Sequence, residues 1–132
     1  MLSLTSASPR EALVKGAVLG ALVSVAIVLI AWSGLLSPRI GLRVEARDLS
    51  QTDFAFVPDP LVLAPASAVA LTFINASSEP HNLVLLAPID RRTGYAVEPG
   101  DSRVIEFNAP AVGTYRFVCT IHEGMNGTLL VE

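Results

Sequence analysis

The feature that most constrains the fold is an apolar run without charges near the N-terminus, from Gly16 to Leu36. Its sequence is GAVLGALVSVAIVLIAWSGLL, and about 20 helical residues of this kind span a hydrocarbon layer of ~30 Å. The run therefore predicts one transmembrane helix over residues 16–36, preceded by an N-terminal tail of residues 1–15. The rest of the chain is long enough for one folded domain.

A cleaved secretory signal is the alternative interpretation of this run. Ala31-Trp32-Ser33 would be the processing site, because small residues occupy the two required positions. The run is longer than the apolar core of about 7 to 15 residues in a signal peptide, so we expect an uncleaved anchor in the cytoplasmic membrane. The flanking charges do not decide its orientation, since Arg10 and Lys15 precede the run and three arginines follow it closely.

The composition of the remaining chain excludes two classes of protein. From Arg39 to Glu132 there are eleven Asp and Glu, seven Arg and no Lys. Nucleic-acid-binding domains carry a basic patch, so we expect no nucleic-acid partner. Cys119 is the only cysteine, which excludes an internal disulfide. A single thiol outside the cytoplasm is then buried, modified or bound to something such as a metal, and burial is the commonest of these.

After Pro38, short segments rich in Val, Ile, Phe and Leu alternate with clusters of Pro, Gly, Asn and Asp. This pattern predicts an all-β domain, and seven or eight strands over roughly 100 residues fit a two-sheet β-sandwich. We expect a linker and first-strand region at 37–52, with the sandwich beginning near residue 40, and the main part of the domain at 53–132. The expected strands are 40–46, 53–57, 61–63, 68–74, 82–86, 103–107, 113–119 and 128–132, with 87–97 as a longer surface connection.

The segment VALTFIN shows the alternation of a half-buried strand. Successive side chains of a strand point to opposite faces of the sheet. The pattern therefore places Val69, Leu71, Phe73 and Asn75 on one face, and the residues between them on the other.

Three scarce side chains recur at every third position in Cys119-Thr-Ile-His122-Glu-Gly-Met125. On an extended strand they would point to alternating faces, whereas in a tight loop they can converge on one point. Gly124 makes such a loop easier to close. Thiolate and thioether are soft ligands and imidazole is intermediate, so the set indicates a metal site.

A second imidazole can complete this set. His81 is the only other histidine, and Pro80 directs the backbone at the start of an expected strand. Each of these side chains alone is more often a core or surface residue than a ligand. Together, His81, Cys119, His122 and Met125 match a mononuclear copper electron-transfer site. Zinc is the nearest rival, but structural zinc sites use Cys and His without a thioether.

Two segments contain these residues, FINASSEPHNLVLL and APAVGTYRFVCTIHEGMNGTLLVE, and they resemble the cupredoxin (blue copper) family. The similarity is to its amicyanin-like or plastocyanin-like members with a short Cys-x-x-His-x-x-Met loop, and it covers most of Arg43–Glu132. The resemblance implies an eight-stranded Greek-key sandwich in an extracytoplasmic compartment, with one copper ion per chain that changes between Cu(I) and Cu(II). It also implies that His81, Cys119 and His122 form a trigonal ligand set and that Met125 is a weak axial ligand.

The resemblance further implies two supporting residues. The main-chain N–H of Asn82 would donate to the Cys119 sulfur, and the Asn82 side chain would tie its strand to the ligand loop at Thr120. One position departs from the family, because many relatives carry Pro after the exposed histidine where this chain has Glu123. A carboxylate there alters the docking face, so the identity of the partner does not carry over from relatives.

Four protein ligands leave no open coordination position for a substrate, so we expect single-electron transfer and no enzymatic activity. The expected function is that of a membrane-anchored carrier on the periplasmic side, exchanging electrons with partners such as a cytochrome or a membrane oxidoreductase. A secreted or periplasmic form after signal cleavage is the alternative location. A copper delivery or buffering protein is the alternative function, although the domain has no His- or Met-rich tract. A sandwich without metal, acting in adhesion or as a subunit, is a third possibility.

Overall fold

The computed structural model describes residues 38–132, and the expected tail and transmembrane helix lie outside them. Pro38–Glu132 forms one compact unit. Residues 38–132 contain no helix whose length and hydropathy would allow it to cross a membrane.

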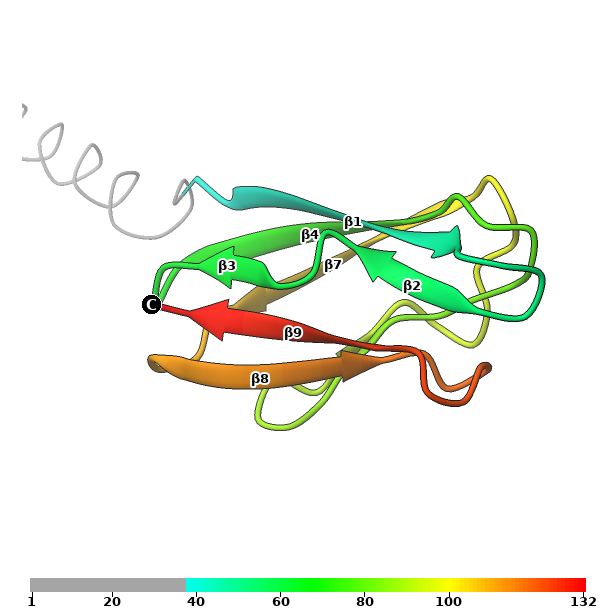
Figure 1. The fold of residues 1–132 in the computed structure, drawn as a ribbon. Coiled ribbons are helices and arrows are strands. Elements are labelled where there is room, and N and C mark those ends of the chain that lie inside the picture. The colour runs from blue at the N-terminus through cyan, green and yellow to red at the C-terminus, as the bar shows by residue number, and fades with distance from the viewer. Residues whose placement is uncertain (1–37) are drawn as a thin grey trace, which may run out of the picture. The chain divides into compact units, whose positions relative to one another are not determined.

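The described residues form nine strands in two sheets, which confirms the all-β sandwich with one or two strands more than expected. Figure 1 labels all of these strands except the short β5 and β6. The four-stranded sheet has the order β2-β1-β4-β7, and the five-stranded sheet has the order β3-β9-β8-β5-β6. The strands are β1 (Ile40–Asp48), β2 (Phe54–Val57), β3 (Leu61–Leu63), β4 (Ala68–Asn75), β5 (Val84–Leu85), β6 (Arg91–Arg92), β7 (Ser102–Asn108), β8 (Gly113–Val118) and β9 (Asn126–Val131).

The additional strand is β6, which lies in the segment expected to be a surface connection. It pairs antiparallel with β5, with Arg91 opposite Leu85 and Arg92 opposite Val84. Both arginines are exposed, so the strand has no buried face and no apolar alternation that could reveal it. β5 is shorter than expected, and His81 lies outside it in an isolated bridge to Val97.

β4 is an interior strand of its sheet and shows the expected alternation. Val69, Leu71, Phe73 and Asn75 are buried, whereas the residues between them are only partly buried. β1 lies parallel to β4 from Ile40 onwards, so the sandwich begins at that residue. The alternation of β4 therefore turns its buried side chains toward the second sheet.

Aromatic contacts join the two sheets. The ring of Phe56 in β2 lies 6.2 Å from that of Phe73 and 5.0 Å from that of Phe117 in β8, in edge-to-face geometry. Close packing also explains Gly127 in β9, because a Cβ there would collide with the Phe117 ring. The sheets are therefore held at a fixed separation, which is the framework on which the loops at their ends rest.

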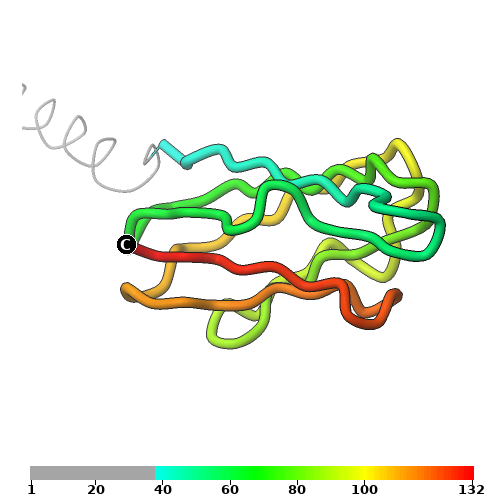
Figure 2. The backbone as a smooth tube through the Cα atoms, viewed as in Figure 1, coloured from blue at the N-terminus to red at the C-terminus, as the bar shows by residue number. Residues whose placement is uncertain are grey.

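Three connections gather at one end of the sandwich, away from the C-terminus: those after β1, after β4 and between β8 and β9 (Figure 2). Hydrogen bonds join the first two, since the Ser78 main-chain N–H and hydroxyl donate to the Asp48 carboxylate at 3.1 and 3.2 Å. The main-chain N–H of Asn75 donates to the carbonyl of Asp101 at 2.9 Å. Residues far apart in the sequence are thus fixed beside one another at this end.

Candidate metal centre

The segment from Cys119 to Met125 forms the tight loop that its spacing predicts. The Cys119 N–H donates to the Met125 carbonyl at 2.9 Å, and the Met125 N–H donates to the His122 carbonyl at 3.4 Å. Gly124 has a φ of 82°, a left-handed conformation that glycine adopts at little cost. The loop therefore returns on itself and brings its first and last residues side by side.

The structure brings together one thiol and two imidazoles from two distant segments. The ligand atoms of His81, Cys119 and His122 all lie within 4.8 Å of one another. The Cys119 sulfur is 3.6 Å from His81 Nδ1 and 3.9 Å from His122 Nδ1. Metal–sulfur and metal–nitrogen bonds of about 2.3 and 2.0 Å, at angles of about 110 to 130°, separate sulfur and nitrogen by about 3.5 to 3.9 Å. The observed spacing therefore fits a single metal ion.

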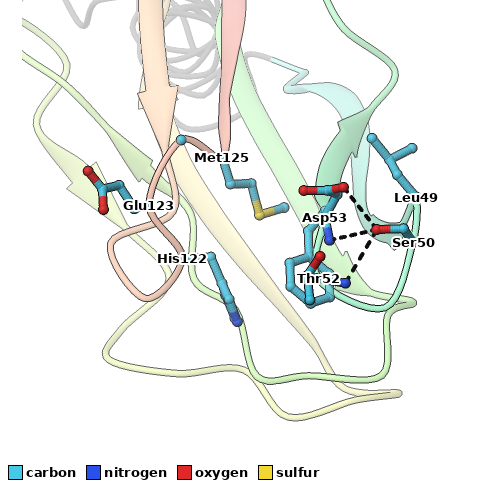
Figure 3. A pocket seen from close by; sticks show the side chains of 9 residues that line it. Leu49, Ser50, Thr52, Asp53, His122, Glu123 and Met125 are labelled. Atoms are coloured by element: carbon cyan, nitrogen blue, oxygen red, sulfur yellow. Dashed lines mark hydrogen bonds between the residues drawn. The ribbon is translucent and has the colours of Figure 1, made fainter.

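Met125 is the last residue of the ligand loop, and its side chain is buried. Figure 3 shows its thioether extending toward the segment that contains Ser50 and Asp53, whereas Glu123 points away from it. Met125 is 4% exposed and lines, together with His122, a pocket of about 410 Å³. A soft thioether is thus placed beside the thiol and imidazoles, and this donor set is the one that copper prefers.

Burial of the centre controls the protonation of His81. Its pKa is lowered to about 4, because burial disfavours the charged ring and the neighbouring His122 disfavours a second positive charge, while Asp48 acts in the opposite direction. His81 is fully buried, so at neutral pH it presents a neutral imidazole. A neutral nitrogen is the form that binds a metal, and protons compete with the metal for it only weakly above about pH 5.

This shift predicts a pH-dependent stability of the metal-free protein. The pKa of His81 is about 4 when folded and about 6.5 when unfolded, so the unfolded chain binds more protons between these values. The free energy of unfolding should therefore fall by about 2 to 3 kcal/mol as the pH drops from 6.5 to 4, and the loss from this group should be complete by about pH 3. Urea unfolding of the metal-free chain and of His81→Gln at several pH values would isolate this contribution. Parallel pH curves for the two proteins would contradict it.

Asn75 positions the connection that leads to His81, a role that the sequence did not reveal. Its Nδ2 donates to the carbonyls of Glu79 and Val97 at 2.7 and 2.8 Å. Its Oδ1 accepts from the Ser77 N–H and hydroxyl at 3.0 and 2.6 Å. The only signal in the sequence is that an amide shares one face of a strand with three apolar residues.

Asn82 and Thr120 form the contact that was expected between their strands. The Asn82 Nδ2 donates to the Thr120 hydroxyl, and the Thr120 N–H donates to the Asn82 Oδ1, both at 2.8 Å. The same amide also donates to the Tyr95 carbonyl at 2.9 Å. Among the hydrogen bonds of residues 38–132, none joins the Asn82 main-chain N–H to the Cys119 sulfur. The side chain of Asn82 thus fixes the ligand loop relative to the segment that carries His81.

Phe54 is the second residue at the centre that sequence reasoning missed. Its ring centroid lies 4.7 Å from that of His81 and 4.5 Å from that of His122, and the two imidazoles are 4.3 Å apart. The spacing of Phe54 and Phe56, two residues apart in one strand, indicates only that the two rings point to the same face of the sheet. It does not indicate that one of them covers the metal ligands.

Comparison with known proteins gives a family match and several similar structures. A family model described as a cupredoxin-like domain matches residues 24–131. The comparison with curated proteins gave no match. The structure resembles auracyanin A from Chloroflexus aurantiacus, described as a "blue" copper protein, with a TM-score of 0.59 and 19% identity over 72% of this chain and 100% of that one.

Two further structures are similar over a comparable share of this chain. Auracyanin B is 26% identical, with a TM-score of 0.55, over 74% of this chain and 93% of its own. A copper-containing nitrite reductase from Thermus scotoductus SA-01 is 23% identical, with a TM-score of 0.52, over 71% of this chain but only 27% of its own. The sandwich is therefore found in small single-domain proteins and as one part of a larger enzyme.

Proposed function

Because the chain belongs to the family of cupredoxin-like domains, we propose that it carries single electrons by means of one copper ion. The family match confirms the resemblance of its two ligand segments. His81, Cys119, His122 and Met125 are arranged as a type 1 copper site. The observation that carries the proposal is the convergence of one thiol and two imidazoles, at 3.6 and 3.9 Å, on one point.

The protein's part in electron transfer is to hold these donors still. When bound, copper supplies one-electron chemistry by changing between Cu(I) and Cu(II). His81 and Cys119 are buried, and the hydrogen bonds of Asn75 and Asn82 fix the segments that carry them. Donors that keep their positions need little rearrangement when the charge of the centre changes. His122 is only half-buried, so its imidazole edge is the route by which electrons enter and leave.

A carrier agrees better with this centre than an enzyme does. Catalytic metal sites keep one coordination position open for water or substrate. Here the four soft or intermediate side chains are all supplied by the chain, and three of them are almost fully buried. The nitrite reductase shares the fold over a quarter of its length, which by itself carries no information about activity.

We propose further that the carrier is anchored in the cytoplasmic membrane with its copper domain on the periplasmic side. The support is the uncharged run Gly16–Leu36, which is long enough to span the hydrocarbon layer. An anchored carrier exchanges electrons with donor and acceptor proteins at the same surface, such as a cytochrome or a membrane oxidoreductase. Protease should cleave the domain in intact spheroplasts and leave it whole in inverted vesicles. The reverse pattern would contradict this orientation.

The electron-carrier function is tested by spectroscopy of the purified full-length chain. We expect one copper ion per chain, an intense visible band from the thiolate-to-copper transition, and repeated bleaching and recovery on reduction and reoxidation. A copper-loaded chain without visible colour would contradict the proposal. Rapid transfer of copper to a metal-free acceptor, without reversible redox cycling, would favour a delivery protein instead.

A further inference from the structure

We propose that Phe54 keeps the metal centre closed, by separating the metal from the pocket beside the ligand loop. This inference rests on the proposed function and deepens it, because it names the side chain that makes the centre suited to electron transfer and unsuited to binding small molecules. Phe54 is a positioning residue in this role, since it has no atom that could bind the metal.

The first observation is the packing of Phe54 on both imidazoles. Its ring lies edge-on to His81 and tilted against His122, at centroid distances of 4.7 and 4.5 Å. Among the described residues, the Cys119 sulfur is the only hydrogen-bonding partner of the His122 ring, at 3.9 Å. The orientation of His122 therefore depends on packing, and Phe54 supplies a large part of it.

The second observation is the position of the pocket relative to the ligands. The pocket of about 410 Å³ lies between the segment Leu49–Phe54 and the loop residues 122–125 (Figure 3). His81 and Cys119 are not part of its wall, whereas Phe54, His122 and Met125 are. The side chains that separate the pocket from the thiol and the buried imidazole are therefore one aromatic ring and two ligands.

The chemistry of the pocket makes this separation important. Its wall includes polar side chains such as Ser50, Thr52 and Asp53, and Leu49 at its edge is 68% exposed. A polar pocket that is open to solvent admits water and small solutes. If the ring of Phe54 were absent, such a molecule could approach the metal between the two imidazoles. The centre would then resemble a catalytic site with an open coordination position.

Asp48 links Phe54 to the connection that leads to His81. Phe54 is the first residue of β2 and lies opposite Asp48 of β1. The Asp48 carboxylate accepts two hydrogen bonds from Ser78, three residues before His81. The end of β1 thus fixes the Phe54 ring relative to the buried ligand His81. The covering of the imidazoles by this ring, here called the Phe54 shield, therefore does not depend on the presence of the metal.

Titration of the copper-loaded full-length chain with a small anion tests whether Phe54 keeps small molecules away from the metal. In Phe54→Val, which removes the ring and keeps a residue suited to a strand, azide should alter the visible spectrum with an apparent Kd at least tenfold lower than in the native protein. Phe54→Tyr keeps the ring and should behave as native. Leu49→Ala widens the same pocket without touching the imidazoles, and it should also behave as native.

Two outcomes of the titration would overturn the inference. One is a copper-loaded Phe54→Val chain whose spectrum ignores azide, and the other is a Leu49→Ala chain that responds as strongly as Phe54→Val. Phe54→Leu repeats the test if the valine variant does not fold. A native chain that binds no copper would contradict the proposed function. This result is seen before azide is added, so it is distinguished from a result that contradicts the role of Phe54.

A second measurement examines the contact without any metal. The chain has only two histidines, so labelling histidine with ¹³C gives two imidazole Cε1–H signals in the full-length protein. Loss of the ring current in Phe54→Val should shift both signals in the metal-free chain, whereas Leu49→Ala should leave both in place. Signals that do not move in Phe54→Val would show that the ring does not cover the imidazoles.

Discussion

Replacement of Cys119 by Ser should abolish the intense visible absorption of the copper-loaded protein. The band requires a thiolate bound to copper, and Cys119 is the only thiol in the chain. A hydroxyl oxygen is a hard donor that stays protonated at neutral pH, so it replaces neither the softness nor the charge of the sulfur. Loss of a residue that only supports a metal ligand costs about 10- to 100-fold in affinity, and loss of the ligand itself should cost at least about 100-fold.

Absorption spectra and metal analysis of Cys119→Ser, measured side by side with the native chain, check this expectation. Ile121→Ala is the matched control, because Ile121 lies in the same loop, is 39% exposed and offers no donor atom. It should keep both the colour and the copper. Residual colour in Cys119→Ser, or loss of colour in Ile121→Ala, would show that the band does not arise from this thiolate.

Replacement of Asn75 by Ala should destabilise the protein by about 3 to 5 kcal/mol and weaken metal binding. Asn75 is fully buried and makes four side-chain hydrogen bonds, which end at Ser77, Glu79 and Val97. Alanine removes all four hydrogen bonds, each of which contributes about 0.5 to 1.5 kcal/mol, and it leaves the Ser77 N–H without an acceptor. The Val97 and Glu79 carbonyls still accept from the His81 N–H and the Ser77 hydroxyl. The connection before His81 also loses its anchor, so this ligand must be ordered again when the metal binds.

Chemical unfolding of the metal-free chain gives the change in free energy, and competition with a chelator gives the change in copper affinity. Asn108→Ala is the matched control, since Asn108 is exposed at the end of β7. It should change both quantities little. An Asn75→Ala protein within about 1 kcal/mol of the native stability would mean that water replaces the lost partners.

The strand pattern and the ligand loop could be predicted because each depends on residues that are close together in the sequence. Alternation in 69–75 predicted the buried face of β4, and a spacing of three with a glycine predicted the loop of Cys119, His122 and Met125. The fourth ligand could be predicted because the chain has only two histidines, so His81 was the only other imidazole.

Features without a local pattern were missed. β6 consists of two exposed arginines and exists because its backbone completes the edge of β5. Asn75 and Phe54 each occupy an ordinary strand position, and their roles depend on what lies opposite them in space. An amide on an apolar face, or one of two phenylalanines spaced two residues apart in a strand, is compatible with many surroundings. Neither position therefore indicates its role.

The sequence by itself determined which side chains could bind a metal, because donor chemistry belongs to the residue and the spacing of Cys119, His122 and Met125 belongs to one short loop. Only the tertiary structure decided that His81, 38 residues before Cys119, meets that loop at 3.6 Å. It also decided that Phe54 covers both imidazoles. The physical reason is that contacts between distant segments are fixed by the packing of two sheets and by hydrogen bonds between their end loops. No short stretch of sequence contains both partners of such a contact.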